Sequence, residues 1–337
     1  MEFPAGYQPN PGAMFQAFNA YHLTAALKGA IELDLFTLID SGAVTAAEMA
    51  TRAGAAERGV RIVCDFLTVA HFLTKNGAEY GLTPDSAFFL SQRSAAYMGS
   101  AIFFLAHPSQ MSGFTDMAAV IRKGGSVQDL SAVAPDHPFW VDFARNMAPI
   151  SAVGAPAMAA ILAKPGIRQN VLDIASGPGA YGIEIARRNG DAHITAIDWK
   201  NVVAVSAENA ARAGLADRYS TISGDIFSAD LGRDYDLILL PNILHHFDAA
   251  TNVQLLERMR AAMKPGGTVA TVEFVPNPDR VSPPAPATFS LVMLTQTPAG
   301  DAYTLSELED MFRKAGFGPS ATHAIPPSPQ TLIVTAY

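Results

Sequence analysis

The segment Val171-Leu-Asp-Ile-Ala-Ser-Gly-Pro-Gly-Ala-Tyr-Gly182 is the stretch of sequence that decides the fold. Its apolar start predicts a buried strand, and glycines at positions 177, 179 and 182 follow in the GxGxxG spacing. Glycine permits the tight turn and the close backbone approach that a nucleotide-like ligand needs between a strand and a helix. The segment therefore predicts the ligand-binding turn of a Rossmann-like sheet.

Strand and helix patterns alternate from this segment to the end of the chain. We expect strands at 171–175, 193–198, 219–222, 235–240 and 268–275, and helices at 181–188, 202–213 and 252–263. A further helix begins at Thr304, which forms a capping box with Glu307. The tail can add two closing strands, 320–325 and 331–337, one of which can be antiparallel. This alternation predicts an α/β domain with a mostly parallel sheet.

Acidic residues stand at the ends of three successive expected strands, at Asp173, Asp198 and Asp225. Asp198 follows Gly177 by 198 − 177 = 21 residues, where a carboxylate can accept hydrogen bonds from ribose hydroxyls. Asp173 distinguishes S-adenosylmethionine from dinucleotides such as NAD as the expected cofactor. A buried carboxylate at this position would repel the pyrophosphate of a dinucleotide. S-adenosylmethionine has no phosphate and carries a sulfonium and an ammonium group. We therefore predict a methyltransferase that uses S-adenosylmethionine and releases S-adenosylhomocysteine.

The third acidic position belongs to the segment Gly224-Asp225-Ile226-Phe227. Asp225 can accept a hydrogen bond from the adenine amino group, while the two apolar side chains after it pack on the ring. The complete expected cofactor site is Asp173, Ala175, Ser176, Gly177, Gly179, Asp198, Trp199, Gly224, Asp225, Ile226 and Phe227.

The first third of the chain has a different pattern, which is mostly helical. We expect one helix over 15–39, a second over 45–53 that Thr45 and Glu48 open with a capping box, and a third over 57–71. Asn76-Gly77 then predicts a hairpin over 72–82. Three helices and a hairpin are the layout of a winged helix. The first helix has more apolar positions than one buried stripe requires, which predicts a homodimer.

Composition excludes several classes of protein. The net charge of −8 argues against nucleic acid and anionic membranes as partners. Cys64 is the single cysteine, so no internal disulfide forms. No basic start followed by an apolar core is visible, and the apolar run 95–106 is too short to span a bilayer. We expect a cytoplasmic protein, and the scattered histidines predict no metal site.

Motifs along nearly the whole chain resemble the small-molecule O-methyltransferases typified by plant caffeic acid O-methyltransferase and acetylserotonin O-methyltransferase. The matching segments are Leu172–Gly179, Ile197-Asp198, Gly224–Phe227, Ile243–Asp248, Met263–Gly267 and Thr271–Glu273. The resemblance implies a winged-helix dimerisation domain at 1–100 and a seven-stranded, Rossmann-like catalytic domain at 166–337. We expect 101–165 to be a helical linker that helps to form the substrate pocket.

The same resemblance implies that His245 is the general base and Glu273 is its partner. Adjacent residues on an extended chain point to opposite sides, so only one of His245 and His246 is expected to be the base. Asp248 is expected to cap the helix that follows it. The aromatic residues near 140 can be core packing or an apolar wall for a flat substrate. The expected substrate pocket is Phe139, Trp140, Phe143, Met147, His246 and Met293.

The chain departs from the family pattern at three places. Ala175-Ser176 stands where the family has more glycine, His246 stands where it has an acid, and Ala302 stands where it has a second acidic helper. We expect O-methylation of a small, largely apolar, aromatic hydroxyl compound whose identity the sequence does not reveal. The alternatives are a non-methylating enzyme that binds S-adenosylmethionine, a non-catalytic dimeric binding protein and an NAD-dependent oxidoreductase.

Overall fold

A computed structural model describes residues 9–128 and 139–337. The chain divides into two compact units, Met1–His107 and Pro108–Tyr337. No helix in the described ranges is long and apolar enough to cross a membrane.

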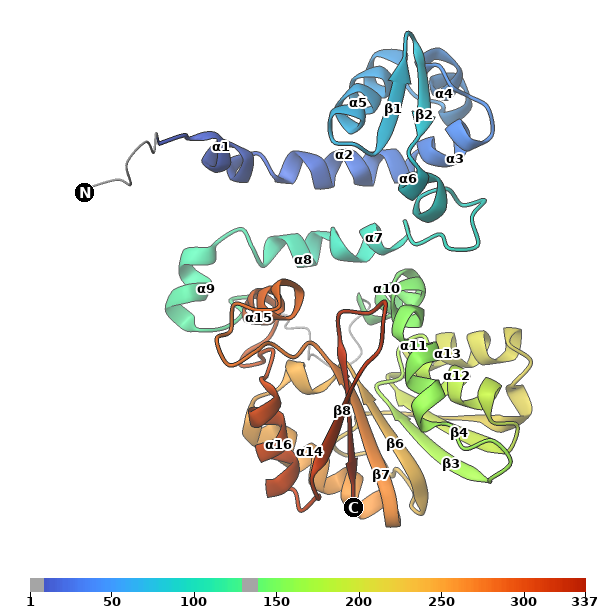
Figure 1. Ribbon diagram of the computed structural model, residues 1–337, viewed down its shortest axis with the longest axis vertical. Coiled ribbons are helices and arrows are strands. Elements are labelled where there is room, and N and C mark those ends of the chain that lie inside the picture. The colour runs from blue at the N-terminus through green and yellow to red at the C-terminus, as the bar shows by residue number, and fades with distance from the viewer. Residues whose placement is uncertain (1–8, 129–138) are drawn as a thin grey trace. The chain divides into compact units, whose positions relative to one another are not determined.

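The N-terminal unit consists of helices and one hairpin (Figure 1). Its elements are α1 (Gly12–Phe18), α2 (Tyr21–Glu32), α3 (Leu35–Asp40), α4 (Ala46–Ala53), α5 (Glu57–Val69), β1 (Leu73–Asn76), β2 (Glu79–Leu82), α6 (Pro84–Phe89) and α7 (Ala101–Leu105). The Thr45 hydroxyl accepts a hydrogen bond from Glu48 N, and the Glu48 carboxylate accepts one from Thr45 N. This confirms the predicted capping box. The antiparallel pairing of β1 with β2 confirms the predicted hairpin.

The expectation of one continuous helix over 15–39 is wrong. The segment is divided among α1, α2 and α3, and Asp34 between the last two has a left-handed φ of 55°. The change of direction allows Leu35 and Phe36, each 2% exposed, to pack in the core of this unit. Burial of these two side chains outweighs the preference of the local sequence for a longer helix.

The C-terminal unit is an α/β domain (Figure 1). Its helices are α8 (Pro108–Ser112), α9 (Met117–Lys123), α10 (Phe139–Asn146), α11 (Ala148–Leu162), α12 (Ala180–Arg188), α13 (Lys200–Arg212), α14 (Ala249–Ala262), α15 (Pro284–Gln296) and α16 (Leu305–Lys314). Its strands are β3 (Gln169–Ile174), β4 (Ala192–Asp198), β5 (Tyr219–Ser223), β6 (Tyr235–Pro241), β7 (Met263–Glu273), β8 (Ser320–Ala324) and β9 (Thr331–Ala336).

The seven strands form one sheet in the order β5-β4-β3-β6-β7-β9-β8. Strands β3 to β7 pair in parallel, whereas β9 is antiparallel to both of its neighbours. This confirms the predicted Rossmann-like sheet and its antiparallel closing strand.

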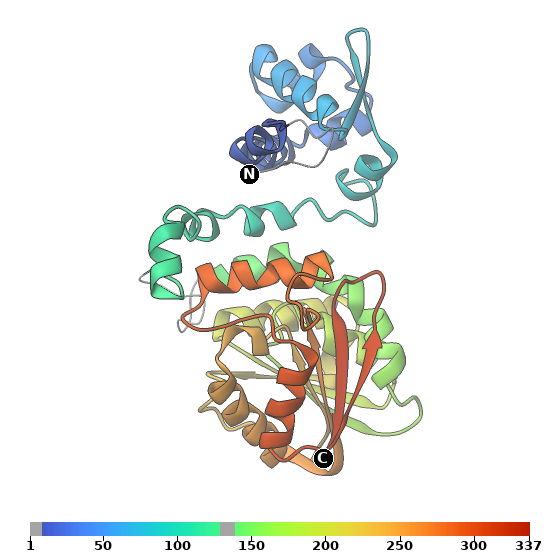
Figure 2. The same ribbon diagram turned by 60° about the vertical axis from the view of Figure 1, so that its left-hand side comes forward.

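Alternating side chains of the central strands pack on opposite faces of the sheet. Val171 and Leu237 belong to the core under α11, α12 and α13, whereas Leu172 and Ile238 belong to the core under α14 and α16. Figure 2 shows these two helical layers with the sheet between them. Both faces are therefore covered, and ligands have access at the strand ends.

The strand order reverses between β3 and β6, because the chain runs outward from β3 to β5 and then returns to β6. Ligands of open α/β sheets bind at the carboxyl ends of the strands beside such a reversal. The glycine-rich turn after β3 and the histidine pair after β6 lie at these two strand ends.

Candidate active site

Two glycines of the turn after β3 have backbone angles that other residues rarely adopt. Gly177 and Gly179 have φ angles of 52° and 78°, in the left-handed region. A Cβ added at Gly179 would lie 2.6 Å from the Tyr219 hydroxyl, and one at Gly182 would lie 2.8 Å from Asp173 Oδ2. The glycine spacing is therefore required by close packing at this turn.

Asp173 lies fully buried beneath the turn. Its Oδ2 accepts a hydrogen bond from Gly182 N at 3.2 Å, but its Oδ1 has no partner within the described residues. Burial raises the pKa of Asp173 to about 8. A buried carboxylate oxygen without a partner fits a cationic ligand group, and it would oppose a pyrophosphate.

Asp198 connects the end of β4 to the glycine turn. Its Oδ2 accepts from Gly177 N at 2.9 Å and its Oδ1 from Trp199 N at 2.7 Å. Burial raises the pKa of Asp198 to about 6, although these two hydrogen bonds oppose the rise. The carboxylate is thus held at the strand end, and each of its oxygens keeps a further lone pair.

The segment after β5 lies beside Asp198, because Gly224 N donates to the Asp198 carbonyl at 3.0 Å. Asp225 Oδ1 accepts from Phe227 N at 2.9 Å, which fixes a short turn. Ile226 is buried, and the Phe227 ring meets Phe247 edge to face at 5.1 Å. The structure therefore brings all three acidic positions to neighbouring strand ends.

His245 and Glu273 form a buried pair across the ends of neighbouring strands. His245 Nδ1 lies 2.6 Å from Glu273 Oε2, and Leu244 N donates to Glu273 Oε1 at 2.9 Å. The side chains are only 6% and 3% exposed. Both carboxylate oxygens are occupied, so the carboxylate holds the imidazole in one orientation.

The expectation that His245 and His246 point to opposite sides is wrong. Both residues lie in a short 3-10 helix, Leu244–His246, and their ring centroids are 4.5 Å apart. The chain has left the extended conformation here, so alternation no longer applies. His246 Nδ1 is buried and has no hydrogen-bond partner in the described part of the chain. Burial, and secondly the neighbouring His245, lower the pKa of His246 well below its ordinary value.

Rings from α10 connect the glycine turn to the histidine pair. A Cβ at Gly177 would lie 3.2 Å from the Phe143 ring, which meets Trp140 at a centroid distance of 5.6 Å. Trp140 in turn meets His246 edge to face at 5.5 Å. Phe139 packs on Trp140 at 5.3 Å. Trp140 also packs against the buried side chains of Ala144, Val202 and Val205, so α10 takes part in the core as well as in these ring contacts.

Two further rings were not predicted from the sequence. Phe289 on α15 meets His245 edge to face at 4.8 Å, and it stacks on Phe274 at 4.2 Å. Helix α15 is apolar on most of its faces, so no periodicity distinguished the face that reaches the histidine. Met293 lies buried on the same helix, and Met147 precedes α11 outside this set of ring contacts.

Comparison with known proteins agrees with this geometry. Residues 123–318 match the model of the O-methyltransferase domain, and residues 15–92 match that of the O-methyltransferase dimerisation domain. The chain belongs to the O-methyltransferase family.

Relatives of this O-methyltransferase include curated and solved proteins. The chain is 28% identical to 3-hydroxy-5-methyl-1-naphthoate 3-O-methyltransferase of Streptomyces sahachiroi, over 87% of this chain and 85% of that protein. It is 44% identical to a solved structure from Nostoc punctiforme that is assigned to the O-methyltransferases, with a TM-score of 0.94 over 98% and 100% of the two chains. Human N-acetylserotonin methyltransferase, solved with S-adenosylmethionine, shares the fold at 21% identity, with a TM-score of 0.85 over 99% of both chains. The protein is therefore an S-adenosylmethionine-dependent O-methyltransferase of small molecules.

Ala302 stands where the resemblance places a second acidic helper. Ala302 is fully buried and has no carboxylate to offer. The neighbouring Asp301 is held by Arg280, whose Nη1 lies 3.1 Å from Asp301 Oδ2. Glu273 is thus the carboxylate that contacts His245 in the described part of this enzyme.

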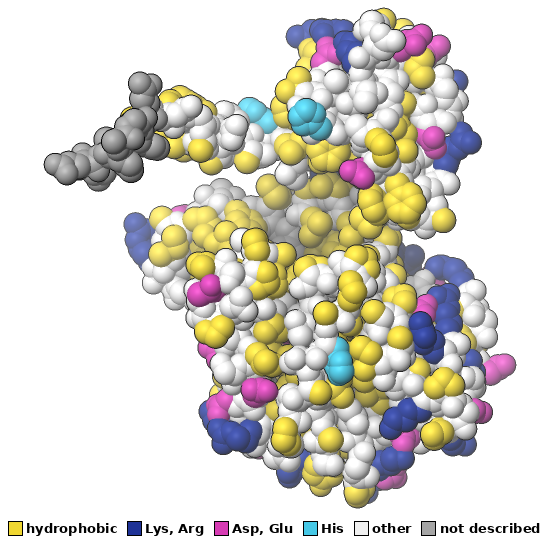
Figure 3. Space-filling view, viewed as in Figure 1, with side chains coloured by type: hydrophobic (Ala, Val, Ile, Leu, Met, Phe, Trp, Pro, Cys, Tyr) yellow, Lys and Arg dark blue, Asp and Glu magenta, His cyan; other side chains and the backbone are white. Residues whose placement is uncertain are grey.

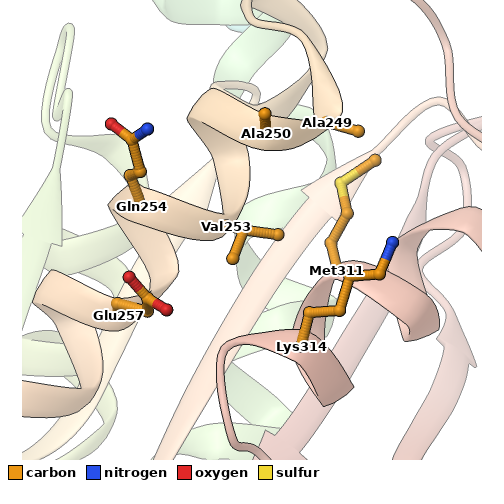
Figure 4. A pocket seen from close by; sticks show the side chains of 7 residues that line it. All are labelled: Ala249, Ala250, Val253, Gln254, Glu257, Met311 and Lys314. Atoms are coloured by element: carbon orange, nitrogen blue, oxygen red, sulfur yellow. The ribbon is translucent and has the colours of Figure 1, made fainter.

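Two surface hollows of the methyltransferase lie away from the pair His245 and Glu273. One, of about 510 Å³, lies between α14 and α16 (Figure 4). Another, of about 250 Å³, lies between α11, α12 and the outer side of Pro178. Neither of these two is lined by His245 or Glu273.

The N-terminal unit carries an exposed apolar surface along α1 and the start of α2, part of which is visible in Figure 3. Phe15, Phe18 and Tyr21 are 59%, 68% and 62% exposed. These three residues lie within the dimerisation-domain match, at 15–92. An exposed surface of this kind on a dimerisation domain supports formation of a homodimer.

Proposed function

We propose that His245 is the general base that deprotonates an aromatic hydroxyl acceptor, whose oxygen then attacks the methyl group in line. The hydrogen bond of 2.6 Å between His245 Nδ1 and Glu273 carries this proposal. Because Nδ1 is committed to Glu273, Nε2 is the ring nitrogen that can take a proton. The Glu273 carboxylate then stabilises the imidazolium that forms.

The residues at the three strand ends fit the groups of the cofactor. Asp173 would face the ammonium end, Asp198 the ribose hydroxyls, and Asp225 with Ile226 and Phe227 the adenine ring. Bound S-adenosylmethionine supplies a methyl group on a positively charged sulfur, and S-adenosylhomocysteine is the leaving group when the acceptor oxygen takes the methyl. The protein contributes position, alignment and the removal of one proton.

An aromatic acceptor is supported by the rings around His245. Trp140 and Phe143 connect the cofactor turn to the histidines, and Phe289 contacts the ring of the base. Flat apolar side chains favour a flat apolar ligand, with edge and face contacts that add to its burial. The Streptomyces sahachiroi relative is named for an aromatic hydroxyl acceptor, which is consistent with this proposal.

Transfer of a labelled methyl group tests the proposal. The full-length protein is incubated with methyl-labelled S-adenosylmethionine and matched sets of phenols, naphthols, aliphatic alcohols and aromatic amines. We expect label on aryl hydroxyls only. Transfer confined to alcohols or amines would overturn the aromatic hydroxyl assignment, and cofactor cleavage without transfer would favour a non-methylating reaction.

A further inference from the structure

His246 is a polar residue that the proposed reaction does not use. Its Nδ1 is shielded from solvent and has no hydrogen-bond partner among the described residues, although the backbone around it is well bonded. A buried nitrogen without a partner costs free energy, and native proteins leave few such groups unsatisfied. A ligand that brings a hydrogen-bonding group to this nitrogen would remove that cost.

The position of His246 indicates which ligand that is. Its ring contacts the rings of both His245, at a centroid distance of 4.5 Å, and Trp140, at 5.5 Å. Trp140 contacts the ring of Phe143, which in turn packs against Gly177 in the cofactor turn. On the His245 side, the ring of Phe289 contacts the imidazole. Successive ring contacts therefore connect the cofactor turn to the base, and His246 is the ring that joins Trp140 to His245.

We propose that His246 determines substrate specificity by hydrogen bonding to a second hydroxyl group on the aromatic ring that is methylated. This inference rests on the proposed function, because it assumes an aromatic acceptor whose reacting oxygen lies at His245. The two imidazoles are neighbours, so the groups that they contact lie close together on one acceptor. The preferred substrate class is then a dihydroxylated or polyhydroxylated arene.

A hydroxyl group fits His246 better than other substituents do. Burial keeps the imidazole neutral, and a neutral imidazole can present Nδ1 either as a donor or as an acceptor. A hydroxyl group pairs with both forms, whereas a methoxy group can only accept and a hydrogen atom can do neither. A neutral ring also places no second negative charge beside Glu273, so it does not repel an acceptor oxygen that is losing its proton.

Paired substrates and two variants test the inference. Each pair consists of a dihydric phenol and its monohydric counterpart, in which hydrogen or methoxy replaces the second hydroxyl. The ratio of kcat/KM within each pair is measured for the wild type, for His246→Phe and for His246→Asn. Phenylalanine keeps the flat ring without a nitrogen. Asparagine places an amide atom the same number of bonds from the backbone as Nδ1.

We expect the wild type to prefer the dihydric member by on the order of tenfold or more. His246→Phe should abolish the preference, and His246→Asn should restore much of it. Calorimetric titration of each phenol into wild-type protein saturated with S-adenosylhomocysteine compares the affinities for the two members of a pair without a variant. We expect the dihydric member to bind more tightly.

Equal kcat/KM within pairs for the wild type, or an unchanged ratio in His246→Phe, would overturn the specificity role. In those cases methylation of both phenols, together with an inactive His245→Ala, leaves the proposed function intact. If the wild type methylates no aryl hydroxyl at all, the proposed function fails and this inference fails with it.

Discussion

Glu273 and His245 are joined by a hydrogen bond of 2.6 Å between two side chains that are almost fully buried. Twenty-eight residues separate them in the chain, and the parallel pairing of β6 with β7 brings them together. Because the second Glu273 oxygen accepts from Leu244 N, the carboxylate fixes the base and the turn that carries it.

Removal of this pair should reduce the rate and leave cofactor binding unchanged. His245→Ala should lower kcat by roughly 10²–10⁴, the usual contribution of a general base. Glu273→Gln should cost less, since an amide can still hold the ring but cannot offset its charge. Single-turnover methyl transfer measures the rate, and titration with S-adenosylhomocysteine provides the control. Full activity in both variants would contradict the assignment of the base.

The loss in His245→Ala should also depend on the acceptor. An acidic phenol ionises without help at high pH, so the difference between variant and wild type should shrink there. A deficit that stays constant from pH 7 to pH 10 would show that His245 acts by some means other than proton removal.

Gly300 supports the backbone of the histidine pair, and we expect Gly300→Ala to impair catalysis. A Cβ at Gly300 would collide with the His245 carbonyl oxygen and lie 2.9 Å from the His246 carbonyl carbon. The variant should lower kcat by about tenfold or more, because a small displacement of a positioned base is costly. Gly190→Ala is the matched control, since a Cβ there meets no atom within 4 Å. Equal activity in the two variants would refute the positioning role of Gly300.

Asp173 should make the stability of the ligand-free protein depend on pH. Its folded-state pKa is raised to about 8, above the ordinary value near 3.8. The unfolded chain therefore releases this proton first, and the free energy of unfolding should fall as the pH rises from about 4 to about 8. Asp198, with a pKa of about 6, acts in the same direction over the lower half of this range.

Asp173→Asn isolates the effect of the first carboxyl. Between pH 6 and pH 8 the variant should lose stability more slowly than the wild type does, as measured by urea unfolding at each pH. Asp217→Asn, at an exposed position, is the control and should follow the wild type. The same Asp173→Asn variant should bind S-adenosylmethionine more weakly, because an amide, unlike the carboxyl group, cannot ionise beside the cationic ligand. A wild-type slope in Asp173→Asn would show that Asp173 does not titrate in this range.

The exposed rings of α1 should hold the homodimer together. Light scattering on the wild type should give twice 35.6 kDa. Phe15→Glu combined with Phe18→Glu should give a monomer, since charges replace two side chains that are 59% and 68% exposed. Val281→Glu, at a 75% exposed position in the other unit, should remain dimeric. A double variant that stays dimeric would place the interface elsewhere.

Much of the fold could be predicted because it depends on short-range rules. Glycine spacing after an apolar strand predicts the turn at Gly177, and the period of apolar residues predicts the order of strands and helices. Asp248 was predicted as a helix cap, and its Oδ1 accepts from Thr251 N at 2.8 Å. Acidic residues at successive strand ends meet because parallel strands end at one edge of the sheet.

The surroundings of the base were decided by tertiary structure. Phe289 reaches His245 from a helix 44 positions later in the chain (289 − 245 = 44), and nothing in its local sequence marks the contact. His245 and His246 share one side because the chain enters a 3-10 turn, which the rule for extended strands did not anticipate. The helix break at Asp34 likewise follows from burial of Leu35 and Phe36. Sequence periodicity specifies elements and their apolar faces, whereas packing between distant elements determines which side chains meet at the acceptor.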